Sequence, residues 1–165
     1  MDEQKRNELT KQTDKLIKEL KGSNLIEDVE SEPIKSELKE LLEQIKTRFP
    51  DFFESSEFYE DDLSLPYIHF ANFFRWLEQK PLADPLMKSA YEFFSSTYEK
   101  AKTNYIKNLL YITFLEDHVA RDYERMRLAY DIFSDYVKKE FEHVFNFVDK
   151  KSEWERVKAS KLKNL

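Results

Sequence analysis

The residues most able to do chemistry in this sequence are its three histidines and the acids near them. Glu140 and His143 form a Glu-x-x-His pair, a spacing that places both side chains on one face of a helix. Two such pairs with two further helical glutamates build a di-metal site in four-helix bundles. Neither His69 nor His118 has an acid three positions earlier, so the sequence holds one pair. We therefore interpret the histidines as surface residues on charged faces.

Other catalytic motifs are weak. Gly22 is the only glycine in the sequence, so a glycine-rich loop that binds phosphates or dinucleotides cannot form. Cysteine is missing, which excludes thiol catalysis, thiolate metal sites and disulfides. A Ser-His-acid triad assembles only in space, but no nucleophile elbow is present. A metal-binding or hydrolytic helical bundle that uses Glu116, His118, Glu140 and His143 is our second hypothesis, and we expect no cofactor.

Charged and aromatic residues that a protein partner could contact are the stronger candidates. Residues 51–62 carry six acids and no Lys or Arg, and clustered carboxylates raise the association rate of a basic partner. Arg and Trp are enriched at binding hot spots, and the helical spacing places Trp76 partly outward. The alternatives are a solvated loop and a Trp76 packed against a neighbouring helix. The predicted partner-binding residues are Glu57, Glu60, Asp61, Asp62, Arg75, Trp76, Glu116 and Asp117.

The acids at 116 and 117 have two interpretations. Glu116 and Asp117 stand directly after the most apolar run of the sequence, residues 109–115. They could act as a paired acid site or as charges that reach a partner. They could equally end a buried segment and face solvent.

Helices must position these residues. Apolar residues recur at three-and-four spacing from residue 2 to 21, from Ser31 to the residue before Pro50, and from residue 66 to 80. Asp84 followed by Pro85 predicts a helix start, because an Asp can cap free backbone N–H groups while a proline occupies the first turn. Residues 52–65 mix aromatic and acidic side chains and predict an irregular loop with its aromatics on the core.

The second half of the sequence is also helical by its pattern. Thr103 predicts the cap of a helix whose middle is the apolar run 109–115, although a buried strand would look similar over seven residues. The last long helix is predicted from 121 to 147, where apolar residues keep the same spacing throughout. Trp154 and Val157 extend a weaker apolar pattern into a basic tail that we expect to be frayed.

Composition agrees with this fold class. The 165 residues include 14 Phe and 9 Tyr, which predict a core of large planar side chains. Tight turns of antiparallel sheets need residues with positive φ, and this sequence nearly lacks them. The formal net charge of −6 argues against nucleic acid as a partner. The polar first residues and the lack of a long apolar stretch predict a cytoplasmic protein that does not bind membranes.

One region resembles a known family. It begins at Leu65-Pro66, continues through the aromatic helix with Arg75-Trp76, and ends with residues 105–117, YIKNLLYITFLED. This order is similar to a family of small helical bacterial proteins of unknown function, some of which sit among immunity proteins to polymorphic toxins. The similarity covers about residues 45–120 and implies a fold more than an activity. The residues that it marks are Pro66, Asn108, Phe114 and Glu116, none with a demonstrated role in that family.

These observations predict an all-α protein, an irregular bundle of about six helices with an aromatic-rich core. The chain is expected to form a single domain over residues 1–165, with residues 1–24 as a loosely attached helical arm. Our first function hypothesis is a non-catalytic protein-interaction module, in one form an immunity-type inhibitor whose partner is a basic toxin. The second is the enzyme described above. A third is a structural protein that associates with itself through the arm. The sequence names no partner or oligomeric state.

Overall fold

The computed structural model describes residues 31–60 and 65–162, and within them every regular element is helical. The all-α prediction is therefore confirmed for this part of the chain. Eight α-helices are described where about six were predicted, together with one π-helical and two further 3-10 segments. The α-helices are α2 (Glu32–Arg48), α3 (Pro50–Phe53), α4 (Pro66–Glu78), α5 (Pro85–Lys100), α6 (Asn104–Leu110), α7 (Tyr123–Ile132), α8 (Asp135–Glu142) and α9 (Lys151–Leu162). The other segments are η2 (Tyr111–Glu116), η3 (Val119–Arg121) and η4 (His143–Asn146).

Two of the predicted helix starts are confirmed by their caps. The Asp84 carboxylate accepts a hydrogen bond from the backbone N–H of Leu86 at 2.8 Å, with Pro85 in the first turn of α5. The Thr103 hydroxyl accepts from the N–H of Ile106 at 3.3 Å at the start of α6. These side chains satisfy backbone donors that the first turn of a helix leaves free.

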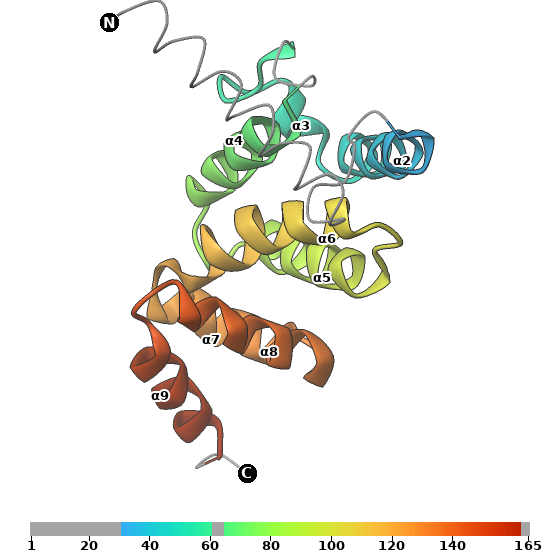
Figure 1. The fold of residues 1–165 in the computed structure, drawn as a ribbon. Helices are drawn as coiled ribbons and strands as arrows, with labels where there is room; N and C mark the ends of the chain where they lie inside the picture. The colour runs from blue at the N-terminus through green and yellow to red at the C-terminus, as the bar shows by residue number, and fades with distance from the viewer. Residues whose placement is uncertain (1–30, 61–64, 163–165) are drawn as a thin grey trace, which may run out of the picture.

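The helices stack in layers (Figure 1). At one end α2 and α4 lie near α3, α5 and α6 run side by side in the middle, and α7 and α8 form the next layer before α9. One cluster of buried hydrophobic residues extends through the described layers, from Leu41 of α2 to Val157 of α9. Aromatic rings fill much of this cluster, as the composition predicted.

The acidic-aromatic loop is anchored as expected. Phe52 is fully buried, and Phe53 and Phe58 pack partly buried against the core. Tyr59, in contrast, is 60% exposed. The loop therefore attaches to the core through phenylalanines and leaves its polar residues at the surface. Residues 61–64 lie outside the described part of the chain.

The apolar run 109–115 is helical, as predicted, but not α-helical throughout. From Tyr111 to Glu116 the backbone forms the π-helical segment η2, in which the N–H of Asp117 donates to the carbonyl of Ile112 at 2.9 Å. Such π turns are rare and occur frequently at functional sites. This one brings the chain to His118.

Two predictions about the C-terminal third are wrong. The helix predicted from 121 to 147 is broken between α7 and α8, because the Ser134 hydroxyl caps a new helix by accepting from the N–H of Val137. The basic tail is not frayed over residues 151–162, since Trp154 and Val157 are buried on the core. The predicted arm, residues 1–24, lies outside the described residues. No helix in the described ranges is both long and apolar enough to span a membrane.

Candidate functional site at the end of α4

His118 is the centre of a polar cluster inside the fold. Its side chain is 1% exposed, so the prediction of a surface histidine is wrong for this residue, and it is wrong for His69, which is also 1% exposed. The π-helical segment η2 ends two residues earlier, and the ring turns into the core beside three aromatic rings. Phe74 stacks on it at a centroid distance of 5.0 Å, Tyr91 lies edge-on at 5.5 Å, and Phe114 lies at 6.5 Å.

Glu78 is the polar partner of His118. One carboxylate oxygen, Oε1, lies 3.2 Å from His118 Nδ1, and the other accepts a hydrogen bond from Arg121. Because an ionised carboxylate only accepts, the hydrogen between Glu78 and His118 must be carried by Nδ1. Glu78 is the last residue of α4, where an acid meets the negative end of the helix dipole. Two donors from another part of the chain compensate for that placement.

The electrostatics favour an ionised Glu78 and a neutral His118. The hydrogen bond from His118, with a further contribution from Arg121, lowers the pKa of Glu78 from 4.5 to about 2. Burial lowers the pKa of His118, and the charges of Arg125 and Arg121 act in the same direction against the opposing effect of Glu78. His118 therefore donates to the carboxylate as a neutral ring at neutral pH.

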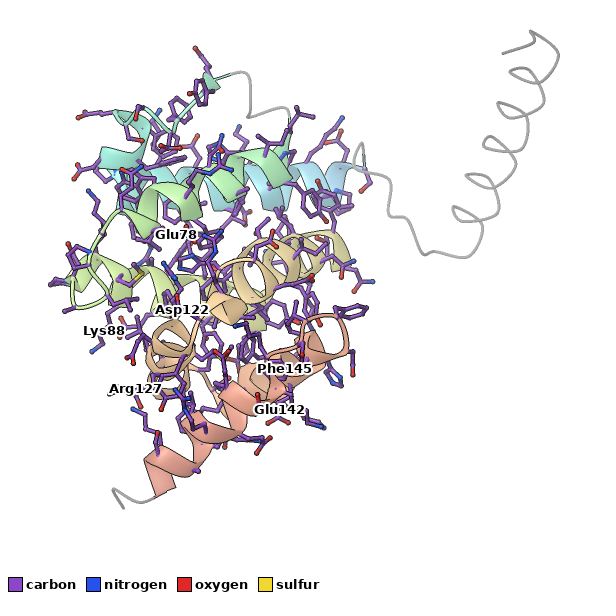
Figure 2. The ribbon with its side chains drawn as sticks, turned by 90° about the vertical axis from the view of Figure 1, so that its left-hand side faces the viewer. Glu78, Lys88, Asp122, Arg127, Glu142 and Phe145 are labelled. Carbon is purple, nitrogen blue, oxygen red and sulfur yellow. The ribbon has the colours of Figure 1, made fainter. Side chains whose placement is uncertain are left out.

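A surface recess of about 170 Å³ lies directly over this cluster. It opens between α4 and the segment from η2 to η3, and Figure 2 shows Glu78 at the end of α4 on the same side of the molecule as Asp122 at the start of α7. The lining residues are Ala71, Phe74, Arg75, Glu78, Thr113, Asp117, His118 and Arg121. The lining is therefore mostly polar and charged, with Ala71 and Phe74 as its apolar members.

The charges of the recess are not equally engaged. Arg75 donates to the Asn72 amide oxygen at 2.9 Å, and Arg121 is held by Glu78. The Asp117 carboxylate makes no hydrogen bond or ion pair within the described part of the chain. Burial raises the pKa of Asp117, with the charge of Arg121 opposing this effect. An incoming cationic group would stabilise the charged form of the Asp117 carboxylate.

His118 is poorly placed for acid–base catalysis on a molecule in the recess. The Nδ1 atom of His118 is occupied by Glu78, and Nε2 is buried inside the fold. A general base must lie within hydrogen-bond reach of the proton that it takes. Neither nitrogen of His118 can meet this requirement without rearrangement.

The structure separates the residues of the predicted metal or hydrolytic site. In the described ranges no group of three or more His, Asp and Glu side chains could hold a metal ion. Glu140 instead accepts a hydrogen bond from the Tyr98 hydroxyl at 3.1 Å and lies 3.9 Å from Lys107. His143 is exposed at the surface, whereas His118 is buried.

The predicted partner-binding residues have mixed positions. Trp76 is 3% exposed, so the prediction that it points partly outward is wrong; its ring lies 5.7 Å from Phe52 and 5.5 Å from Phe73. Arg75 and Asp117 are exposed and share the recess. Glu116, the residue before Asp117, is partly buried.

The predicted acidic loop contacts the chain at the end of the same helix. Glu57 accepts a hydrogen bond from Gln79 Nε2 at 3.0 Å, which ties the loop to the residue after α4. Glu60 is exposed, whereas Asp61 and Asp62 lie outside the described residues.

Sequence reasoning missed Glu78 and Arg121 and misplaced His118. Two signals were available. An acid at the C-terminal end of an aromatic helix opposes the helix dipole and indicates a compensating partner. His118 also follows Leu110 and Phe114 at a spacing of four, which places it on their buried face. The neighbouring acids concealed this second signal.

Comparison with known protein families, curated proteins and solved structures found no match to this chain.

Proposed function

We propose that this protein is a non-catalytic protein-binding module that binds its partner with one surface, the α4–η2 face. We define this face by the exposed residues Leu65, Ile68, Arg75, Ile112 and Asp117. The observation that carries the proposal is the exposure of large apolar side chains beside the charged recess. Leu65 is 52% exposed, Ile68 is 46% exposed and Ile112 is 40% exposed.

These apolar residues are placed to act together with the recess. Ile68 lies on the first turn of α4, one turn before Ala71 of the recess wall. Ile112 precedes Thr113 of the opposite wall, on η2. Exposed apolar residues are common singly, but a group of them beside fixed charges is typical of a protein-interaction site.

The acid of this face supports a contact with a cationic group of the partner. Asp117 is the acid of the recess that has no ion pair among the described residues. The net charge of −6 adds a long-range attraction for a positively charged protein. We therefore propose a partner that places a Lys or Arg side chain against Asp117 and an apolar patch against Ile68 and Ile112. Neutralisation of a basic toxin would be one form of this function.

The test is affinity purification of the partner from the source cells, followed by a binding measurement with variants. Ile68→Asp places a charge at the centre of the apolar part of the face and is expected to weaken binding at least about tenfold, the effect of losing one hot-spot residue. Asp117→Lys reverses the proposed charge contact and is expected to weaken binding similarly.

A matched control is Phe147→Asp. Phe147 is 73% exposed and follows η4, away from α4 and η2 in sequence. We expect this variant to bind as the unmodified protein does. A partner that binds all three variants equally, or the lack of any stoichiometric partner at low and moderate salt, would contradict the proposal.

A further inference from the structure

A second surface recess, which we call the C-terminal recess, lies where α8, η4 and α9 meet. Its volume is about 360 Å³, at the small end of the range for ligand pockets, roughly 300–1,000 Å³. Its lining includes Lys139, Glu142, Phe145, Lys151, Trp154 and Glu155. Figure 2 labels Glu142 and Phe145, which mark this site. It shares no lining residue with the recess at the end of α4.

The charges of the C-terminal recess have a positive balance. Its two acids are bound by one lysine of α9, because Lys158 Nζ lies 2.9 Å from Glu142 Oε1 and 2.7 Å from Glu155 Oε1. The hydrogen bond from Lys158 is the main cause that lowers the pKa of Glu142, so this carboxylate is charged and compensated. Lys139 and Lys151 are both exposed. With the acids already bound to Lys158, these two lysines give the recess a net positive charge.

Aromatic side chains supply the apolar part of the same site. Trp154 is 1% exposed, and its ring lies 4.9 Å from the Phe141 ring and 6.4 Å from the Phe145 ring. Phe147 comes directly after Asn146, a residue of the recess lining, and is 73% exposed. An exposed ring beside two lysines suits a ligand that is both acidic and aromatic.

The acidic-aromatic loop has the complementary chemistry. Its described part, residues 51–60, carries four acids and no Lys or Arg. Tyr59 is 60% exposed, and Glu60 beside it is also exposed. Residues 150–162, in contrast, carry five Lys or Arg and two Glu. Figure 1 shows α3, where this loop begins, in the layer at one end of the described chain and α9 in the layer at the other.

We propose that the C-terminal recess binds the acidic-aromatic loop of a second copy of this chain. Glu60 would face Lys139 and Lys151, and opposite charges would steer and orient the encounter. The Tyr59 ring would pack against Phe147, and such ring pairs contribute about 0.5–1.5 kcal/mol beyond the area that they bury.

The position of the two surfaces determines the kind of assembly. They lie at opposite ends of the described chain, so one molecule cannot join them to each other. The contact is heterologous, because it joins two different surfaces, and each copy that binds still presents one free surface. The copies would therefore add head to tail. This inference does not depend on the proposed binding function, which uses the α4–η2 face.

Sedimentation velocity of the full chain over a concentration series tests the proposal. At about 0.1 M salt we expect the average mass to rise past that of a dimer as the concentration rises. At about 1 M salt the association should weaken, because the screening length falls from about 10 Å to about 3 Å. A chain that stays monomeric at every concentration, that stops at a closed dimer, or that associates equally at both salt concentrations would overturn the proposal.

Two variants separate the two surfaces. Lys139→Glu with Lys151→Glu changes the C-terminal recess alone, and Tyr59→Ala with Glu60→Gln changes the loop alone. Each variant by itself should associate at least about tenfold more weakly than the unmodified chain. Mixed together, they should form a one-to-one dimer and nothing larger, because each supplies the surface that the other lacks. A mixture that associates no better than the separate variants would contradict the head-to-tail contact.

The matched control is Lys88→Glu with Lys100→Glu. It makes the same change of charge on α5, in the middle layer, and both lysines are exposed. This variant should associate as the unmodified chain does. An equal loss of association in the control would mean that net charge, and not the C-terminal recess, governs the assembly. The replaced side chains of all three variants are exposed, and circular dichroism checks that each variant keeps its helices.

Discussion

The aromatic middle of α4 and its polar C-terminal end are packed by different chemistry. Along its middle, Phe73 lies fully buried with Phe49 at 5.3 Å, Phe52 at 5.1 Å and Phe94 at 5.2 Å, all edge-on. At its C-terminal end, Glu78 holds the buried His118 and reaches Arg121. The first region gains stability from apolar area and ring geometry. The second places charges and a histidine where an apolar side chain would stabilise the fold at less cost.

This contrast teaches where function is to be sought. Polar groups buried at an energetic cost are more informative than a well-packed core, because they are retained for specificity or for a site. In this protein the polar end of α4 lines the recess together with Thr113 of the π-helical segment η2. The predictions below test whether the aromatic middle and the polar C-terminal end of α4 differ as described.

The largest effect is expected in the aromatic middle of α4. Phe73→Ala removes a ring with 0% exposure and leaves a cavity among its aromatic neighbours. We expect the free energy of unfolding to fall by about 3–5 kcal/mol, measured by urea denaturation with tryptophan fluorescence. Phe147→Ala is the control, because Phe147 is 73% exposed and its loss should change stability by less than about 0.5 kcal/mol. Similar losses in both variants would contradict the burial argument.

An intermediate effect is expected at the polar end. Glu78→Ala leaves the buried Nδ1–H of His118 without its acceptor, and an unsatisfied buried donor costs about 1–3 kcal/mol. The same urea measurement should show this loss, without the larger loss of Phe73→Ala. The matched control is Glu124→Ala, which removes an exposed ion pair with Arg127 at 3.2 Å and should cost about 0.5 kcal/mol or less. An equal loss in the two glutamate variants would show that burial of His118 is not what matters.

The burial of the aromatic middle of α4 was predictable from the sequence, whereas the contacts of its polar end largely were not. Caps such as Asp84 and Thr103 act on backbone groups a few residues away, so the sequence predicts them from local spacing. The break before Ser134 was missed because Phe133 and Val137 keep the helical spacing across it. The spacing reports which residues face the core, and it does not report where the backbone is interrupted.

The position of Trp76 and the pairing of Glu78 with His118 depend on contacts distant in sequence. Trp76 is buried because Phe52, 24 positions earlier, covers that side of α4. Glu78 and His118 are 40 residues apart. No local pattern fixes such pairs, so the sequence could predict that α4 has a buried stripe but not what covers its flanks. The exposure of Arg75 and Asp117 was within reach of helical periodicity, whereas their shared recess was not.

The smallest predicted effect is a pH dependence confined to the polar end. Glu78 has a pKa of about 2 in the folded protein against an ordinary 4.5, so the unfolded chain binds the proton first as the pH falls. Its contribution to stability is complete above pH 4.5 and is lost progressively between 4.5 and 2. His118 acts in the same direction at higher pH, because burial lowers its pKa below 6.5 and protonation then favours the unfolded chain.

The size of this change in unfolding free energy depends on how much the Glu78 carboxylate is exposed to solvent. A shift of this size would correspond to roughly 3 kcal/mol for a fully buried group, but Glu78 faces the recess and solvent screens it, so we expect about 1 kcal/mol. The measurement is the difference in unfolding free energy between the unmodified protein and Glu78→Gln at pH 7 and at pH 3. That difference should shrink by about 1 kcal/mol at the lower pH, because protonated Glu78 resembles glutamine. A difference that stays constant would mean that the His118 and Arg121 contacts do not hold Glu78 in its charged form. The contrast between the aromatic middle and the polar end of α4 would then lose its electrostatic basis.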